Sequence, residues 1–132
     1  MIRKLLRGVW IWGPPLALML VIFFLSSRQK ISVSEDLSTN FVIFKSLHII
    51  EYACLTLLFI RAQILSFKLS AREAIIISAL MTLAYGISDE IHQTFVPTRT
   101  GKVFDILIDS IGISLASMTT SKYFSAFKKY VT

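Results

Sequence analysis

The chain has 132 residues, of which 55% are hydrophobic and only 17% are charged, and it carries a formal net charge of +6. This length fits one domain covering residues 1–132, and the charged fraction lies well below the about 25% that is usual for soluble domains. Long apolar runs therefore indicate an integral membrane protein. The basic residues lie between these runs, where positive charge reports membrane topology, so no nucleic-acid partner is expected.

The first apolar segment covers residues 9–25 and contains Pro14 and Pro15 near its start. Because both prolines lack an amide donor, the helix is expected either to begin near Gly13 or to kink there. Basic residues precede the segment, as in a signal peptide, but the apolar stretch is long and a poor cleavage site follows it. A retained membrane helix is therefore expected. Ser26 and Ser27 are interpreted as solvated end residues, with a nucleophile as the alternative if a base lies close.

The second segment, residues 41–60, carries a stripe of polar side chains. On an α-helix, Lys45, His48, Glu51 and Tyr52 fall within an arc of about 120°. The stripe is interpreted either as part of a functional site or as a set of interhelical contacts that fixes packing. Cys54 lies among apolar neighbours and is expected to pack in the core, so no disulfide is predicted.

The third segment, residues 74–95, ends in a polar cluster. Asp89, His92 and Gln93 are spaced to share one helix face, with Glu90 at its edge. An acid and a histidine at this spacing are able to bind a metal or form an acid–base pair, but the spacing is common at polar helix ends. No metal and no other cofactor is therefore expected.

The fourth segment, residues 103–118, is short for a membrane span and is expected to tilt little or to lie buried among its neighbours. Asp105 and Asp109 share a face with Gly112 and Ala116, within roughly 60° of each other. The two small residues would allow another helix to approach closely. Asp105 is alternatively a helix-start acid that favours the helix dipole. Asp109 is expected to be protonated or paired. Its candidate partners are Lys45, His48 and Arg99.

The connection at residues 96–102 is short, so the third and fourth segments are predicted to form an antiparallel hairpin. Arg99 in this turn is placed to reach Glu90 or Asp105, or to meet a phosphate or carboxylate of a ligand.

The distribution of Lys and Arg predicts that both termini are cytoplasmic, because cytoplasmic loops carry the excess of positive charge. Nine basic residues fall on the side of the termini and four on the other side. All four helices would then bring their polar groups to one depth near the outer leaflet. The nine are Arg3, Lys4, Arg7, Arg61, Lys68, Arg72, Lys122, Lys128 and Lys129, and the four are Arg28, Lys30, Arg99 and Lys102.

From about residue 26 to residue 116, the chain resembles the VanZ-like membrane proteins. The resemblance rests on Lys-x-x-His-x-x-x-Tyr, on Asp-Glu-x-x-Gln-x-Phe followed by Pro-x-Arg, and on a further Asp and Gly one helix later. These residues are Lys45, His48, Tyr52, Asp89, Glu90, Gln93, Phe95, Pro97, Arg99, Asp105 and Gly112. Many members of the family have Gly before the Arg and a small residue shortly after it, where this chain has Thr98 and Lys102.

The resemblance implies an all-α, multi-pass protein of the bacterial cytoplasmic (inner) membrane. It also implies a link to the envelope, because the family's namesake is associated with low-level resistance to teicoplanin-type glycopeptide antibiotics. Such antibiotics and their cell-wall targets lie outside the cytoplasm, on the side where the polar groups are predicted.

Three classes of function remain open. The first is a polar pocket in the outer leaflet that binds or modifies a membrane lipid or lipid-linked envelope component, with an acid as general base and Lys45, His48 and Arg99 holding an anionic group. The second is proton or cation translocation. The third is a structural or partner-binding bundle. The candidate site comprises Lys45, His48, Glu51, Tyr52, Asp89, Glu90, Gln93, Arg99, Asp105 and Asp109.

Overall fold

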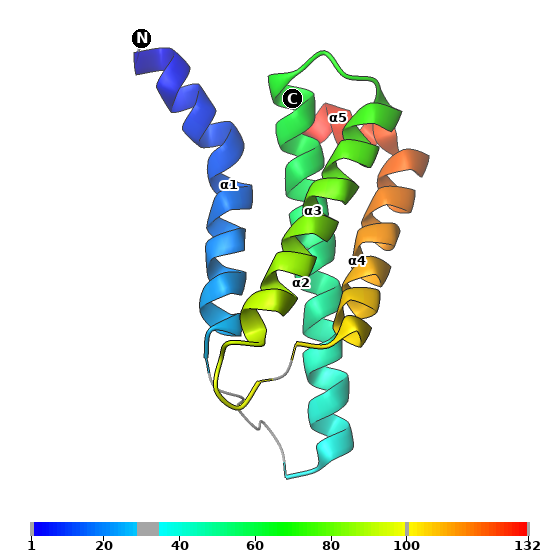
Figure 1. Ribbon diagram of the computed structural model, residues 1–132. Coiled ribbons are helices and arrows are strands. Elements are labelled where there is room, and N and C mark those ends of the chain that lie inside the picture. The colour runs from blue at the N-terminus through cyan, green and yellow to red at the C-terminus, as the bar shows by residue number, and fades with distance from the viewer. Residues whose placement is uncertain (1, 29–34, 100, 132) are drawn as a thin grey trace.

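The computed structural model describes residues 2–28, 35–99 and 101–131, and these residues form an all-α bundle (Figure 1). Lys30, which entered the topology prediction, lies outside the described residues. The helices of the described residues are α1 (Ile2–Ser26), α2 (Leu37–Ser66), α3 (Ala71–Gln93), α4 (Val103–Lys122) and the short α5 (Phe124–Val131).

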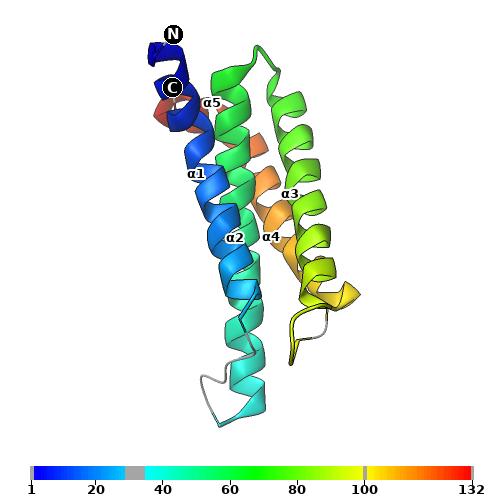
Figure 2. The same cartoon turned by 60° about the vertical axis from the view of Figure 1, so that its left-hand side comes forward.

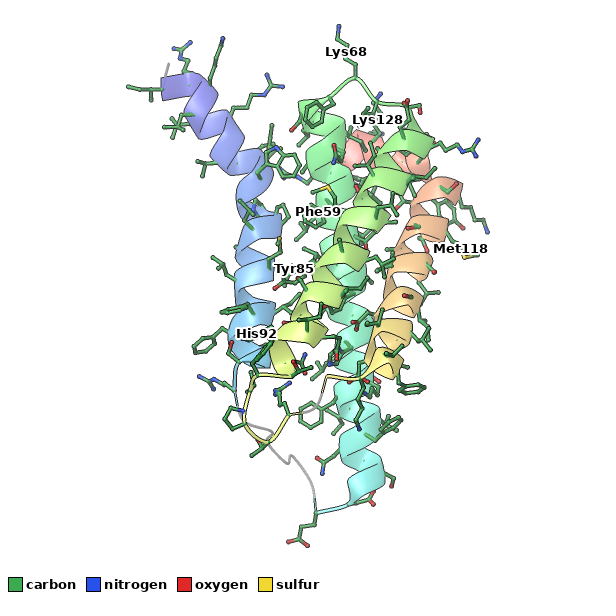
Figure 3. All side chains as sticks on the ribbon, viewed as in Figure 1. Phe59, Lys68, Tyr85, His92, Met118 and Lys128 are labelled. Carbon is green, nitrogen blue, oxygen red and sulfur yellow. The ribbon has the colours of Figure 1, made fainter. Side chains whose placement is uncertain are left out.

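Four of these helices are long and apolar enough to cross a membrane, which confirms the predicted multi-pass bundle. They comprise Ile2–Ser26, Ser38–Ser66, Ala71–Gln93 and Val103–Lys122. Large apolar side chains point outward from all four, as lipid-facing residues do; Leu20, Ile50, Leu80 and Met118 are examples. Figure 3 shows Met118 on the outer side of α4.

The helix boundaries differ from the predicted ones because several helices extend past their apolar segments into flanking polar residues. The N-cap Asp36 begins α2 four residues earlier than predicted, by accepting hydrogen bonds from the amides of Ser38 and Thr39. Hydrogen bonds from the side chains and amides of Ser38 and Thr39 also hold the pKa of Asp36 well below its usual range. The prediction that the fourth span is short is wrong, since α4 has 20 residues and reaches about 30 Å. Helix α5 was not predicted.

Helix α1 runs through both prolines and does not begin at Gly13, so the kink alternative holds; Figure 1 shows the bend. Pro14 and Pro15 have no N–H to donate to the carbonyl groups of Trp10 and Ile11, one turn earlier. Arg61 supplies the donors: its Nη1 lies 3.3 Å from the Trp10 oxygen and 3.4 Å from the Ile11 oxygen. Its guanidinium also lies 4.0 Å from the centre of the Trp10 ring. Arg61 therefore lies inside α2 and not in the connection where the topology count placed it.

The bundle centres on α2, α3 and α4, with the most extensive contact between α2 and α4. Helix α1 packs mainly on α2 and only marginally on α3, as the two views in Figures 1 and 2 show. The start of α1, the connection from α2 to α3, and α5 lie at one end of the bundle. The connections from α1 to α2 and from α3 to α4 lie at the other end. Both described chain ends therefore share one side, as predicted; that this side is the cytoplasm stays a prediction.

An apolar core begins one turn from the charged residues, at Ile22 of α1, and continues toward the chain termini. Ile22, Leu55 and Phe59 form its centre, and Met81 and Tyr85 of α3 pack against it. The expectation that Cys54 packs in this core is wrong, because its side chain is exposed on the outer surface of α2.

Candidate functional site

The opposite half of the core contains the ionisable side chains, which α2, α3 and α4 deliver to one depth, and α1 adds the hydroxyl group of Ser26. Asp89 and Glu90 end α3, Asp105 and Asp109 begin α4, and His48 lies in the corresponding part of α2. Asp109 is only 1% exposed and Glu90 only 4%. The candidate residues therefore form an enclosed site, and the half-buried Lys45 and His48 form its more accessible edge.

At the centre of the site, His48, Glu90 and Asp109 form a histidine–carboxylate cluster. His48 Nδ1 lies 3.0 Å from Asp109 Oδ1, which selects His48 from the three predicted partners of that acid. One ligand-type atom from each of the three residues lies within 4.8 Å of the others. Each residue comes from a different helix, so the cluster joins α2, α3 and α4.

Several buried polar atoms around this cluster have no hydrogen-bond partner among the described residues. They are Glu90 Oε1, Asp109 Oδ2 and the Tyr52 hydroxyl. The Tyr52 ring packs against the backbone of Gly86, where an added Cβ would lie 3.0 Å from the ring and 3.5 Å from Asp109 Oδ2. Buried polar atoms nearly always have a hydrogen-bond partner, so these atoms mark a place where a bound ligand, ion or water would supply the partner.

Lys45 and Asp105 form an ion pair between α2 and α4 at the edge of the site. Their charges neutralise each other, which removes the need to bury either alone. Lys45 is therefore paired with a side chain of the protein itself. The sequence had instead suggested that it holds an anionic ligand.

A second hydrogen-bonded group, the Asp89 network, consists of Ser26, Asp89, Gln93 and Arg99. Ser26 donates to Asp89 Oδ1 over 2.6 Å, and Gln93 Nε2 donates to Asp89 Oδ2 over 2.8 Å. Arg99 Nη1 in turn lies 3.4 Å from Gln93 Oε1. The network ties α1 to α3 and to the turn that precedes α4.

Arg99 does not reach Glu90 or Asp105, so that interpretation of its role is wrong. Its Nε donates to the Arg28 carbonyl over 2.7 Å and its Nη2 to the Leu25 carbonyl over 3.1 Å. These carbonyl groups lie at and just beyond the end of α1, where the helix leaves its acceptors unpaired and its dipole favours a positive charge. Arg99 therefore fastens the end of α1 to the turn.

Ser26 was misjudged from the sequence, because it is buried and bonded to Asp89 and is not a solvated end residue. Its position at the end of an apolar helix resembles that of Ser27, which is exposed and donates to the Phe23 carbonyl. A signal that separates the two is helical phase: Ser26 lies four residues after the buried Ile22, on the face of α1 that meets its neighbours.

The remaining polar residues of the candidate stripes take peripheral places. His92 stacks on Phe23 of α1, with ring centroids 4.5 Å apart, and does not join Asp89 in an acid–base pair (Figure 3). Glu51 is half-buried and lies one turn from His48. Of the ten predicted residues, Glu51 alone makes no hydrogen bond or ion pair and has no unpaired buried atom within the described part of the chain.

Two glycines let the backbones come close enough to build the site. A Cβ on Gly112 would lie 2.2 Å from the Ile49 carbonyl oxygen, so α4 and α2 meet here backbone to backbone, as the small residues predicted. A Cβ on Gly101 would lie 2.1 Å from the Glu90 carbonyl oxygen. The tight turn also brings the Lys102 amide 2.8 Å from Glu90 Oε2.

The fold and the site define a multi-pass helical membrane protein with an enclosed cluster of ionisable groups at one end. The family model described as VanZ/LLP1 matches residues 12–124, and the chain belongs to this family. No curated protein and no solved structure matches the chain.

Proposed function

We propose that this protein binds a lipid-linked component of the bacterial cell envelope in the outer leaflet of the cytoplasmic membrane. The observation that carries the proposal is the convergence of buried acids from α3 and α4 with His48 of α2, some with oxygen atoms that have no partner among the described residues. Ionisable groups inside a membrane span are costly and mark functional sites more often than packing devices.

An apolar groove beside the site supports a ligand with a lipid tail. This groove of about 480 Å³ lies between α1 and α3 and is lined by Leu16, Met19, Leu20, Phe23 and Tyr85. Tyr85, labelled in Figure 3, lines the groove from α3 and donates a hydrogen bond to the Met19 carbonyl of α1 over 2.6 Å. An acyl or isoprenoid chain fits such a surface, since the groove is uncharged and faces the bilayer.

The polar end of the same groove suits a headgroup. Phe23 lines the groove, and Ser26 of the Asp89 network follows one turn later on α1. Asp89 likewise follows Tyr85 by one turn on α3. A lipid chain in the groove would therefore present its headgroup to the Asp89 network, with Arg99 at the partly exposed edge.

Any chemical step would use the acids next to this headgroup. Asp109 with His48, or Glu90, is the candidate general base when the histidine–carboxylate cluster holds no cation, because these carboxylates are buried and have oxygens that no described residue binds. The link to teicoplanin-type glycopeptides belongs to the same proposal, because a protein that holds a lipid-linked wall precursor would alter the target of these antibiotics.

The proposal is tested by lipid capture. The full chain would be extracted from bacterial membranes in mild detergent, and lipid-linked envelope precursors that remain bound would be measured by native mass spectrometry. Asp89→Asn should lower their occupancy at least tenfold, whereas Glu73→Gln, the same loss of charge at the far end of α3, should leave it unchanged. Teicoplanin susceptibility of cells that express each variant gives the biological readout.

Equal occupancy in wild type and Asp89→Asn at equal levels of folded protein would contradict the proposal. A fall in protein abundance that matches the fall in occupancy and in antibiotic phenotype would instead favour the structural alternative, in which the cluster only fixes packing.

A further inference from the structure

We propose that His48, Glu90 and Asp109 bind a divalent cation, and that Zn²⁺ is the ion this donor set fits best. The three residues come from α2, α3 and α4, and their ligand-type atoms already lie within 4.8 Å of one another. This inference stands on the cluster itself and holds whether or not the protein binds a lipid-linked component.

The donor types match zinc chemistry. Zn²⁺ binds imidazole nitrogen and carboxylate oxygen at about 2.0–2.2 Å, and sites with one open position commonly use three protein ligands. Ligands of one such ion lie roughly 3.3–3.6 Å apart in a tetrahedral arrangement, so the three side chains need to close by about 1 Å. Mn²⁺ shares the preference for carboxylates and is the second ion to test.

The unpaired oxygens provide a second and independent observation. Asp109 is 1% exposed and Glu90 is 4% exposed, yet Asp109 Oδ2 and Glu90 Oε1 have no hydrogen-bond partner among the described residues. A buried carboxylate oxygen without a donor is unfavourable, and a bound cation removes that cost for both acids at once.

The charge balance points the same way. Lys45 is paired with Asp105, and Arg99 is engaged by backbone carbonyls and Gln93, so neither neutralises the cluster. With His48 neutral, as a metal ligand must be, Glu90 and Asp109 carry two negative charges in an apolar surrounding. One divalent cation neutralises them, which is the condition for burying charge in a site of this kind.

Neighbouring groups orient the ligands. The Lys102 amide holds Glu90 Oε2 at 2.8 Å, and such outer contacts fix the direction in which a ligating carboxylate points. Three ligands leave the ion a free position, so a water molecule or an anionic oxygen of a ligand completes its coordination.

Metal content of the purified full chain tests this inference. Protein in mild detergent would be stripped with a chelator, reloaded separately with Zn²⁺ and Mn²⁺, desalted and analysed by mass spectrometry of the elements. About one ion per chain is expected for Zn²⁺. Folded wild-type protein that retains less than about a tenth of an ion per chain for both metals would overturn the inference.

Charge-neutral variants locate the ion. Asp109→Asn, Glu90→Gln and His48→Gln should each weaken Zn²⁺ binding at least tenfold. Matched controls carry the same changes outside the cluster: Asp36→Asn, Glu73→Gln and His92→Gln should bind as the wild type does. Wild-type affinity in both acid variants would overturn the inference.

A spectrum of the unmodified chain keeps the test decisive if a variant fails to fold. Co²⁺ substituted for Zn²⁺ should give weak visible bands of nitrogen and oxygen ligation. A strong thiolate band would place the ion at the exposed Cys54 and overturn the assignment.

Discussion

The two halves of the bundle core solve the problem of buried polarity in different ways. In the half nearer the termini, the core is apolar apart from amide and hydroxyl groups, and the hydroxyl groups of Thr56 and Thr82 donate to carbonyls one turn earlier, over 2.8 and 2.9 Å. In the other half, the polar groups are charged and come from different helices. The threonines of the first half bond within their own helix, although Arg61 and Tyr85 reach carbonyl groups of α1. The charged side chains of the second half depend on partners from neighbouring helices.

This difference bears on the choice of function. The hydroxyl groups of Thr56 and Thr82 bond to carbonyls of their own helices. Beyond Glu51, which lies one turn from His48, the described residues of the apolar half hold no acidic or basic side chain before Arg61. A path for protons across the whole bundle therefore has little support. The charged half instead resembles a site that opens to one side of the membrane.

The largest expected effect distinguishes the two halves directly. Asp109→Ala should lower the free energy of unfolding by about 3–5 kcal/mol, because it leaves His48 and the neighbouring charges without their buried partner. Thr82→Ala should lower it by only about 1 kcal/mol, since the carbonyl of Ser78 remains bonded within its helix. Unfolding in mixed detergent and SDS micelles measures both.

Added metal sharpens this comparison. With a chelator present, the difference in free energy of unfolding between Asp109→Ala and Thr82→Ala reflects the protein groups alone. With Zn²⁺ present this difference should increase, because only Asp109→Ala removes a proposed metal ligand. If both variants lost the same free energy of unfolding with and without Zn²⁺, the two halves would not differ in how much their polar groups stabilise the protein.

Much of this architecture follows from the sequence, because the apolar runs and the positions of the charged residues are local features. The four spans, the shared depth of the polar groups and the close approach at Gly112 were all predicted. The pairing of His48 with Asp109 was predicted only as one of several choices, since helix rotation decides it and sequence spacing does not.

The errors about Ser26, Arg99 and Arg61 share one physical cause, which is that each side chain meets groups from a distant segment of the chain. Ser26 finds Asp89 across 63 residues, and Arg99 finds the Leu25 carbonyl across 74 residues. Arg61 was read as a topology signal because its role depends on carbonyls freed by prolines on another helix. None of these partners is visible in local pattern or propensity.

A second, smaller effect concerns Arg61, a basic side chain that binds backbone carbonyls in the apolar half. Arg61→Met keeps the length of the side chain but removes the donors to the Trp10 and Ile11 carbonyls, which should cost about 1.5–3 kcal/mol. Amides of α1 around Pro14 should then exchange faster with deuterium, while those of α4 should not. Arg72→Met, at an exposed position of α3, is the control. Unchanged exchange in α1 would mean that the freed carbonyls find other donors.

The smallest effect is a gain in stability at the charged end. Thr98 has φ of 68°, and it is the only residue other than glycine with a positive φ in the described part of the chain. A β-branched residue pays about 1–2 kcal/mol for this conformation, and glycine adopts it without strain. The resemblance to the VanZ-like proteins implies glycine at this position in many members, which agrees with the left-handed conformation of Thr98.

Thr98→Gly should therefore stabilise the protein by up to about 1 kcal/mol, because the relief of strain exceeds the about 0.4–1 kcal/mol of added freedom in the unfolded chain. The same change at Thr94, where φ is −64° and ψ is −21°, should destabilise it, since an ordinary helical conformation gives glycine no advantage. Unfolding in mixed micelles compares the two variants. A loss of stability in both would mean that Thr98 makes contacts worth more than its backbone strain, and the charged half would then rely on this turn as it relies on its ion pairs.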